Sequence, residues 1–217
     1  MTRGTAAGAP TDRGGLAVGR PDGLLGPRAV LVPVKAFAEA KQRLSPAVGD
    51  RERRALAQQM AEQVLRAADP LPVAVVCDDT EVADWARRHG AFVVWEPGRG
   101  LNGAVEAGID RLSGIGVERV TVAHGDLPNA VGLGDLPPFS GITLVPDRRN
   151  DGTNVVDLPV GCGFRFSYGP GSFERHRGEC DRIGMAVRVL RAPALTLDVD
   201  VPTDLGWSPD ASSAGLR

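Results

Sequence analysis

Two lysines in the stretch LVPVKAFAEAKQRL (31–44) are the first residues that suggest chemistry. The chain has 25 basic residues, but only Lys35 and Lys41 are lysines and all the others are arginines. An ammonium is a compact charge on a flexible stem, whereas a guanidinium is a planar fork, so the two are not interchangeable at a close-fitting site. The pair therefore predicts contacts with phosphate oxygens, and a solvated helix face is the alternative.

Carboxylates follow two later apolar runs. Asp126 lies in HGDLP (124–128), and Asp198 and Asp200 lie in LDVDVPTDL (197–205). If the last segment is a strand, Asp198 and Asp200 share one face, because the side-chain period of a strand is two. Carboxylates can hold Mg²⁺ against phosphate oxygens. Together with the lysines, these residues predict a metal-assisted phosphate reaction.

The elements that must position these residues alternate between apolar strands and helical patterns. This alternation predicts an α/β fold with a mostly parallel, doubly wound sheet, on which ligands bind beyond the carboxyl ends of the strands. The expected strands are 29–34, 73–77, 91–95, 119–124 and 141–146. The expected helices are 50–68, with Asp50 as N-cap, 81–89 and 102–112. After residue 150 the pattern loosens, and we expect strand segments at 153–158, 163–166, 185–190 and 195–200 and a helix near 171–179.

Composition narrows the class of protein. The formal net charge of −2 gives no reason to expect nucleic-acid binding, and no apolar run is long enough for a membrane span. Three cysteines without a spacing pattern fit a reducing, cytoplasmic compartment. We expect one domain over 28–207, a disordered leader over 1–27 and a flexible tail over 208–217.

Five motifs in order carry a resemblance: VPVKAFAEAKQRL, HGDLP, DGTN, YGPGSFERH and LDVDVPTDL. Over about residues 28–205 the chain resembles the 2-phospho-L-lactate or phosphoenolpyruvate guanylyltransferases of coenzyme F-420 biosynthesis. The resemblance implies a single-domain, glycosyltransferase-A-like (Rossmann-like) nucleotidyltransferase fold. It implies GTP and a small phosphorylated acid as partners, and a reaction in which a phosphate oxygen of the acid displaces pyrophosphate from GTP. The composition is typical of a high-GC genome, which within this family favours phosphoenolpyruvate.

The resemblance also implies roles for individual residues. The residues expected at the triphosphate and the leaving pyrophosphate are Lys35, Lys41 and Arg43. The expected Mg²⁺ ligands are Asp126 with Asp198 or Asp200. The residues expected at the small acid are Thr153, Gly169, Ser172 and His176, helped by backbone amides at the start of the helix. The residues expected at the nucleoside are Gly100, Leu101 and Asn102, with Asp78 or Glu96 at the guanine edge.

Two departures and several alternatives stay open. His124 is bulkier than the small residue expected before Gly-Asp, and the loop DRRNDGTN (147–154) lacks a Gly or Thr expected there, so either departure can alter the substrate pocket. His124 and His89 are both interpreted as structural residues. The arginines at 51, 53 and 54 are interpreted as a solvated helix face. Another nucleotidyltransferase of the same fold is one rival, although no Gly-rich loop follows the first strand. A non-catalytic nucleotide-binding module is the other rival, and a homodimer is left open.

Overall fold

The computed structural model describes residues 25–199 and Asp204. Most of the expected leader, the whole expected tail and Asp200 therefore lie outside the described residues. Within the described part, the packed chain begins slightly before the expected residue 28. Leu25 is buried, and the Pro27 carbonyl accepts hydrogen bonds from the backbone N–H groups of Glu118 and Arg119.

The described strands form one seven-stranded sheet in the order β3-β2-β1-β4-β6-β5-β7. All pairings are parallel except those of β6, which runs antiparallel to both of its neighbours. The mostly parallel sheet is thus confirmed. The strands are β1 Arg28–Pro33, β2 Val73–Cys77, β3 Phe92–Trp95, β4 Arg119–Ala123, β5 Ile142–Pro146, β6 Thr153–Pro159 and β7 Val187–Val189.

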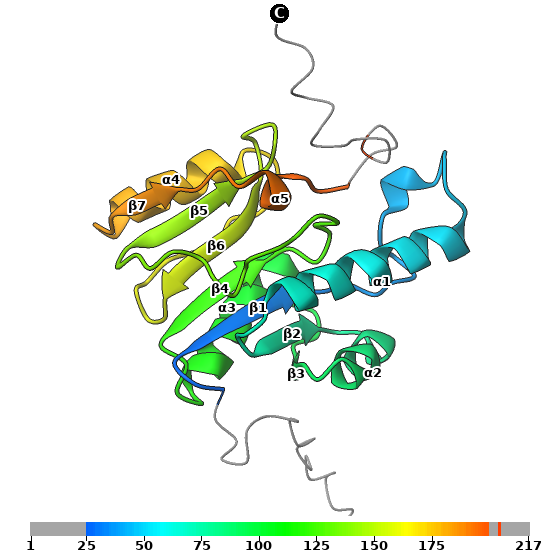
Figure 1. Ribbon diagram of the computed structural model, residues 1–217, viewed down its shortest axis with the longest axis horizontal. Helices are drawn as coiled ribbons and strands as arrows, with labels where there is room; N and C mark the ends of the chain where they lie inside the picture. Colours follow the sequence, from blue (N-terminus) through cyan, green and yellow to red (C-terminus); the bar gives the residue numbers. More distant parts are fainter. Residues whose placement is uncertain (1–24, 200–203, 205–217) are drawn as a thin grey trace, which may run out of the picture.

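Helices cover both faces of this sheet (Figure 1). The helices are α1 Asp50–Ala67, α2 Thr80–Arg88, α3 Gly100–Ser113, α4 Ser172–Arg182 and the short α5 Pro193–Thr196, with a 3-10 turn at Gln42–Leu44. Side chains of α1, α2 and α5 share one apolar core, and side chains of α3 and α4 share another. Neighbours such as Val30 and Leu31 are both fully buried, one in each core, because β1 is covered on both faces.

Local capping explains where two helices begin. The N-cap of α1 is Gly49, and its N–H donates to the Glu52 carboxylate at 3.3 Å. The expected cap, Asp50, is instead the first helical residue, where its charge favours the helix N-terminus. Asp79 caps α2 by accepting a hydrogen bond from the Val82 N–H at 3.0 Å.

The expected strand at 195–200 is wrong for the residues that are described. Pro193 begins the short helix α5, and 197–199 have no regular secondary structure. The backbone polar groups here bond to loops and side chains in place of a strand ladder. Thr196 O accepts from the Arg148 N–H, and Leu195 O accepts from the Asn154 side-chain amide. The segment 163–166 also forms no strand, although Phe164 and Phe166 are buried.

A buried ion pair fixes β6 against β4. Asp157, on β6, is 2% exposed, and Arg119 of β4 donates to its carboxylate through Nε at 2.9 Å and Nη2 at 2.7 Å. The Thr121 hydroxyl donates to the other carboxylate oxygen at 3.0 Å. Every oxygen of this buried charge therefore has a partner, and the pairing holds at one register.

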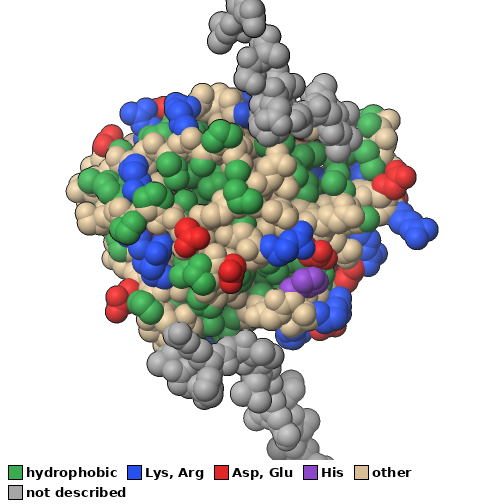
Figure 2. Space-filling model, in the orientation of Figure 1, with side chains coloured by type: hydrophobic (Ala, Val, Ile, Leu, Met, Phe, Trp, Pro, Cys, Tyr) green, Lys and Arg blue, Asp and Glu red, His purple; other side chains and the backbone are tan. Residues whose placement is uncertain are grey.

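The surface carries charges of both signs. Figure 2 shows lysine and arginine side chains interspersed with carboxylates on the face in view, in line with the formal net charge of −2. None of the helices in the described part of the chain is both long enough and apolar enough to cross a membrane.

Candidate active site

A cavity of about 610 Å³ opens at one edge of the sheet. It lies beyond the carboxyl ends of β1 and β4, where Lys35, Gly125 and Asp126 line it. Because β6 is antiparallel, its first residues, Thr153 and Asn154, reach the same edge and complete the wall. The cavity thus lies beyond the carboxyl ends of β1 and β4, between which the strand order reverses, as ligand sites on open α/β sheets commonly do.

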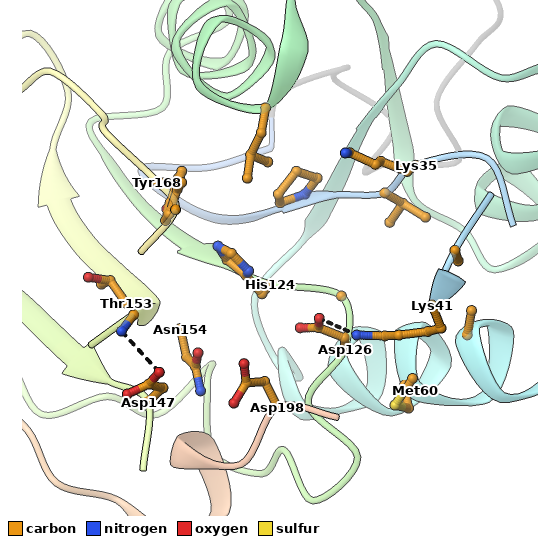
Figure 3. A pocket seen from close by; sticks show the side chains of 18 of the residues that line it. Lys35, Lys41, Met60, His124, Asp126, Asp147, Thr153, Asn154, Tyr168 and Asp198 are labelled. Atoms are coloured by element: carbon orange, nitrogen blue, oxygen red, sulfur yellow. Dashed lines mark hydrogen bonds and ion pairs between the residues drawn. The ribbon is translucent and has the colours of Figure 1, made fainter. Parts of the chain in front are cut away.

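One side of the cavity is charged. The Lys41 ammonium donates to Asp126 Oδ2 at 2.6 Å, and the two side chains are only 8% and 24% exposed. Figure 3 shows the pair pointing toward each other, opposite Thr153 and Tyr168, with His124 and Asp198 between the two sides. Burial by itself would raise the pKa of Asp126, but the charges of Lys41 and His124, together with hydrogen bonds from Lys41 and the backbone, outweigh it and hold the pKa below its usual value. Asp126 is therefore a carboxylate.

The segment that carries Lys41 is held in an uncommon conformation. Lys41 has φ 57° and ψ 36°, the left-handed region that non-glycine residues rarely adopt. Arg53 of α1 supports this segment by donating a hydrogen bond to the Ala40 carbonyl at 2.9 Å. Arg53 is only 4% exposed, so its assignment to a solvated helix face is wrong. Lys35 and Arg43 also line the cavity, and both are exposed.

The residues present fit a magnesium ion. Asp126 Oδ1 is buried and has no hydrogen-bond partner among the described residues, so one carboxylate oxygen is left for a cation. Asp198 lines the same cavity, and Asp200 lies outside the described residues. The described part of the chain contains no group of three or more metal-ligating side chains. Mg²⁺ commonly takes one or two carboxylates together with substrate phosphates and water, so this donor set is sufficient.

Opposite the Lys41–Asp126 pair, the lining formed by the hydroxyls of Thr153 and Ser172 is uncharged and buried, and it is called the neutral side, although Asp147, Arg149 and Asp151 of the adjoining loop also line the cavity. Thr153 is 2% exposed, Ser172 is 1% exposed, and their hydroxyl oxygens lie 3.5 Å apart. His176 is fully buried behind them, with Nδ1 3.0 Å from the Thr153 hydroxyl oxygen. Burial, and then the nearby Arg175 and His124 charges, lower the pKa of His176 to about 4. The histidine is therefore uncharged at neutral pH, and it lies behind the cavity lining.

Loop 147–152 sets the position of Thr153. Asp147 accepts hydrogen bonds from the backbone N–H groups of Arg149, Asp151 and Gly152 at 3.0, 2.9 and 2.9 Å. Sequence reasoning missed this residue, although an aspartate directly after a strand is a typical organiser of a tight loop.

The start of α4 is already capped by the same loop. Gly171 N–H donates to the Asp151 carboxylate, and Phe173 N–H donates to the Asp151 carbonyl. Ser172 N–H donates to the Gly169 carbonyl. These amides therefore do not form the expected anion site, although Gly169 and Ser172 both line the cavity.

Of the five residues expected at the nucleoside, only Leu101 lines the cavity. The Asn102 side chain accepts a hydrogen bond from the Tyr168 N–H at 2.8 Å, so it supports the part of the cavity wall that contains Tyr168. Glu96 pairs with Arg99 at 2.7 Å. Asp78 and Gly100 are exposed and outside the cavity lining. A contact of these residues with guanine stays a prediction.

Three further lining residues were not assigned to the site from sequence. His124 and Tyr168 meet edge to face with ring centroids 4.7 Å apart, between the charged and neutral sides. Asn154 lines the cavity beside Thr153. The sequence signal for His124 was its unusual size before Gly-Asp, a departure expected to alter the substrate pocket, although the histidine itself was interpreted as a structural residue.

Comparison with curated proteins finds relatives over most of the chain. A protein of Sphaerobacter thermophilus named phosphoenolpyruvate guanylyltransferase is 34% identical over 85% of this chain and 95% of its own length. One from Conexibacter woesei with the same name is 34% identical over 81% of this chain and 84% of its own length. A 2-phospho-L-lactate guanylyltransferase of Methanocaldococcus fervens is 27% identical over 82% of both chains.

Solved structures agree with the fold. A nucleotide-diphospho-sugar transferase of Desulfovibrio desulfuricans, itself assigned provisionally, matches with TM-score 0.66 and 17% identity, covering 82% of this chain and 84% of that one. A nucleotidyl transferase of Methanothermobacter matches with TM-score 0.58 and 12% identity, covering 83% and 94%. These likenesses confirm the nucleotidyltransferase type of fold. Residues 28–207 match the family described as guanylyl transferase CofC like, and the chain belongs to that family.

Proposed function

We propose that this protein transfers GMP from GTP to the phosphate of phosphoenolpyruvate or 2-phospho-L-lactate and releases pyrophosphate, in coenzyme F-420 biosynthesis. The names of relatives that align with most of the chain support this activity. The single structural observation that carries it is the two-sided cavity. A Lys41–Asp126 pair lies on one side, and the buried hydroxyls of Thr153 and Ser172 lie on the other.

The reaction needs no nucleophile from the protein. A phosphate oxygen of the acid forms a bond to the α-phosphorus of GTP, and the bond from that phosphorus to the bridging oxygen of pyrophosphate breaks. Catalysis then depends on placing the two substrates and on stabilising charge.

The charged side suits the triphosphate. Lys41 and Lys35 are ammonium groups at the carboxyl edge of the sheet, where they would neutralise the phosphates and the leaving pyrophosphate. Asp126 and Asp198 would hold Mg²⁺. When bound, the ion would supply positive charge to the phosphate oxygens of GTP. The neutral side suits the small acid, because hydroxyl donors can bind an anionic oxygen without adding a competing charge.

Phosphoenolpyruvate is the favoured acid. The relatives at 34% identity carry that name, whereas the relative named for 2-phospho-L-lactate is at 27%. The two acids differ only around the carbon that bears the phosphate, so discrimination by packing alone is worth about 1–3 kcal/mol.

A small matrix of assays tests the proposal. Purified protein with Mg²⁺ is mixed with each of four nucleoside triphosphates and with either acid, and pyrophosphate release is measured. We expect release with GTP and phosphoenolpyruvate, and slower release with 2-phospho-L-lactate. Release with CTP or another nucleotide but not with GTP would support a different nucleotidyltransferase activity, and no release in any well would support a binding module.

Location and assembly are further parts of the proposal. Cys77, Cys162 and Cys180 form no disulfide, in keeping with a reducing cytoplasm. A homodimer is an expectation that sedimentation of the purified chain would test.

A further inference from the structure

A buried histidine outside the cavity lining contacts Thr153, a residue of the neutral side. His176, on α4, is fully buried and is packed among Phe164, Phe166 and Tyr168, whose ring centroids lie 5.4, 6.0 and 5.1 Å from its own. Its Nε2 lies 3.0 Å from the Ser167 backbone nitrogen, and its Nδ1 lies 3.0 Å from the Thr153 hydroxyl oxygen. Both ring nitrogens thus have partners.

These two contacts determine the tautomer of the ring. A backbone N–H can only donate, so Nε2 must accept the hydrogen bond from Ser167 and carries no proton. The pKa of His176 is lowered to about 4, chiefly by burial, so the ring is neutral near pH 7 and its one proton is on Nδ1. Nδ1–H therefore donates to the oxygen of Thr153.

The direction of this bond fixes what Thr153 can do. Its oxygen accepts from His176, and the Ser172 hydroxyl is a second donor at 3.5 Å. Because the oxygen accepts from His176, the Thr153 hydroxyl keeps its own proton to donate. Among the described residues, no recorded hydrogen bond uses Thr153 Oγ1 as the donor. The residue lines the cavity, so a bound ligand can supply the acceptor.

We propose that His176 is a positioning residue that orients the Thr153 hydroxyl as a hydrogen-bond donor to an anionic oxygen of the small phosphorylated acid. This inference rests on the proposed function, and it changes the role expected for His176 from substrate contact to support. The proposed role predicts different effects on the two substrates, because loss of the hydroxyl orientation weakens binding of the acid and leaves GTP binding intact.

Two amide variants separate the two hydrogen bonds of the ring. His176→Asn can place an amide nitrogen near the position of Nδ1 and keep a donor toward Thr153. His176→Gln reaches instead toward the position of Nε2 and can keep the contact with Ser167. We expect His176→Gln and His176→Phe to raise KM for phosphoenolpyruvate about tenfold, the size of one lost buried hydrogen bond, with KM for GTP unchanged within about twofold. His176→Asn should have a KM for phosphoenolpyruvate close to that of the wild type.

A double-mutant cycle tests whether the histidine acts through the hydroxyl. Thr153→Val should raise KM for the acid at least as much as His176→Phe, and adding His176→Phe to Thr153→Val should change it little further. Cys180→Ala is the matched control, because Cys180 is also fully buried on α4, one turn beyond His176, and does not line the cavity. It should lower the melting temperature without changing either KM.

The outcomes separate this inference from the proposed function. If the wild type shows no pyrophosphate release with GTP and either acid, the proposed function is wrong. If the wild type is active but the KM for the acid is the same in all His176 variants, or rises in the Asn variant and not in the Gln variant, the positioning role is wrong. Additive effects of Thr153→Val and His176→Phe would also contradict it.

Discussion

The two sides of the cavity are built in opposite ways. On the lysine side, a segment that bears exposed Lys35 and left-handed Lys41 lies over the sheet edge, and one ion pair joins it to Asp126. On the neutral side, Thr153 belongs to β6, which is hydrogen-bonded to a neighbouring strand along both edges, and the buried His176 supports the Thr153 side chain. In the proposed reaction, the charged side would neutralise the triphosphate and release pyrophosphate. The neutral side would bind the acid through hydroxyl donors in a fixed place, so selectivity for the acid would depend on it.

The largest expected effect is on the charged side. Asp126→Asn keeps the shape of the side chain but removes the charge that would hold Mg²⁺ and that faces Lys41. We expect kcat to fall about a hundredfold or more, the cost typical of losing one preorganised electrostatic group. Initial rates of pyrophosphate release, measured over a range of Mg²⁺ concentrations, check this.

A matched control for that variant lies on α2. Asp84 is an exposed carboxylate that pairs with Arg87, so Asp84→Asn should leave the rate unchanged. Release by Asp126→Asn at the wild-type rate would mean that the charged side does not serve the metal-assisted chemistry.

The next effect belongs to the neutral side and concerns pH. The pKa of His176 is about 4 in the folded protein, against about 6.5 for an unfolded histidine. Between these values the unfolded chain binds a proton that the folded chain excludes, so the free energy of unfolding falls as pH drops from about 6.5 toward 4. The loss is about 3 kcal/mol at the lower end. Denaturant unfolding at pH 7.5 and 4.5 checks it.

The phenylalanine variant isolates this contribution from that of other groups. His176→Phe cannot titrate, so its stability should depend less on pH over the same interval, although it is less stable at pH 7.5. Equal pH dependence in the two proteins would show that the buried imidazole is not the group responsible.

A smaller effect separates the two lysines. Lys41 is 8% exposed in its side chain, so the bulkier guanidinium of Lys41→Arg should disturb the ion pair with Asp126 and lower kcat/KM for GTP about tenfold. Lys35 is exposed, so Lys35→Arg should lower kcat/KM for GTP only about threefold. Melting temperatures should change little in the Lys35 variant. Normal activity of both would mean that their identity as lysines has no functional cause.

The smallest effect tests how the lysine segment is held. Arg53→Met keeps a long apolar stem but leaves the Ala40 carbonyl without its buried donor. We expect kcat/KM for GTP to fall about fivefold, near 1 kcal/mol, with KM for the acid unchanged. Arg54→Met, at the next position, is the control, since Arg54 is half exposed and pairs only at the surface with Glu81. Equal behaviour of both variants would remove the supporting role of Arg53.

Much of the fold could be predicted from the sequence because buried parallel strands are short, continuous apolar runs. VAVVC was expected at 73–77 and forms β2 over the same residues. The direction of β6 could not be predicted, since TNVVDL has the composition of a buried strand in either orientation. The segment at 195–200 was predicted wrongly because its apolar residues are buried in the core from a short helix and an irregular stretch.

The site was partly predictable for a similar reason. Lys41, Asp126 and Thr153 are polar residues next to apolar strands, and the structure brings all three to one cavity. Supporting residues were harder to predict, because Arg53 and His176 act through long-range contacts that no local pattern encodes. Charge suggested a solvated Arg53, and the resemblance implied a ligand-binding His176, whereas packing buries both side chains.

The buried pair between Arg119 and Asp157 has a consequence far from its own position. The pair fixes the register of β6 against β4. A shift of β6 by one residue would leave the buried Asp157 carboxylate without the Arg119 guanidinium and would turn every side chain of β6 to the opposite face of the sheet. Thr153 lies four residues upstream on the same strand, about 13 Å away. A pair outside the cavity lining thus helps to fix the position of Thr153, the residue proposed to bind the acid.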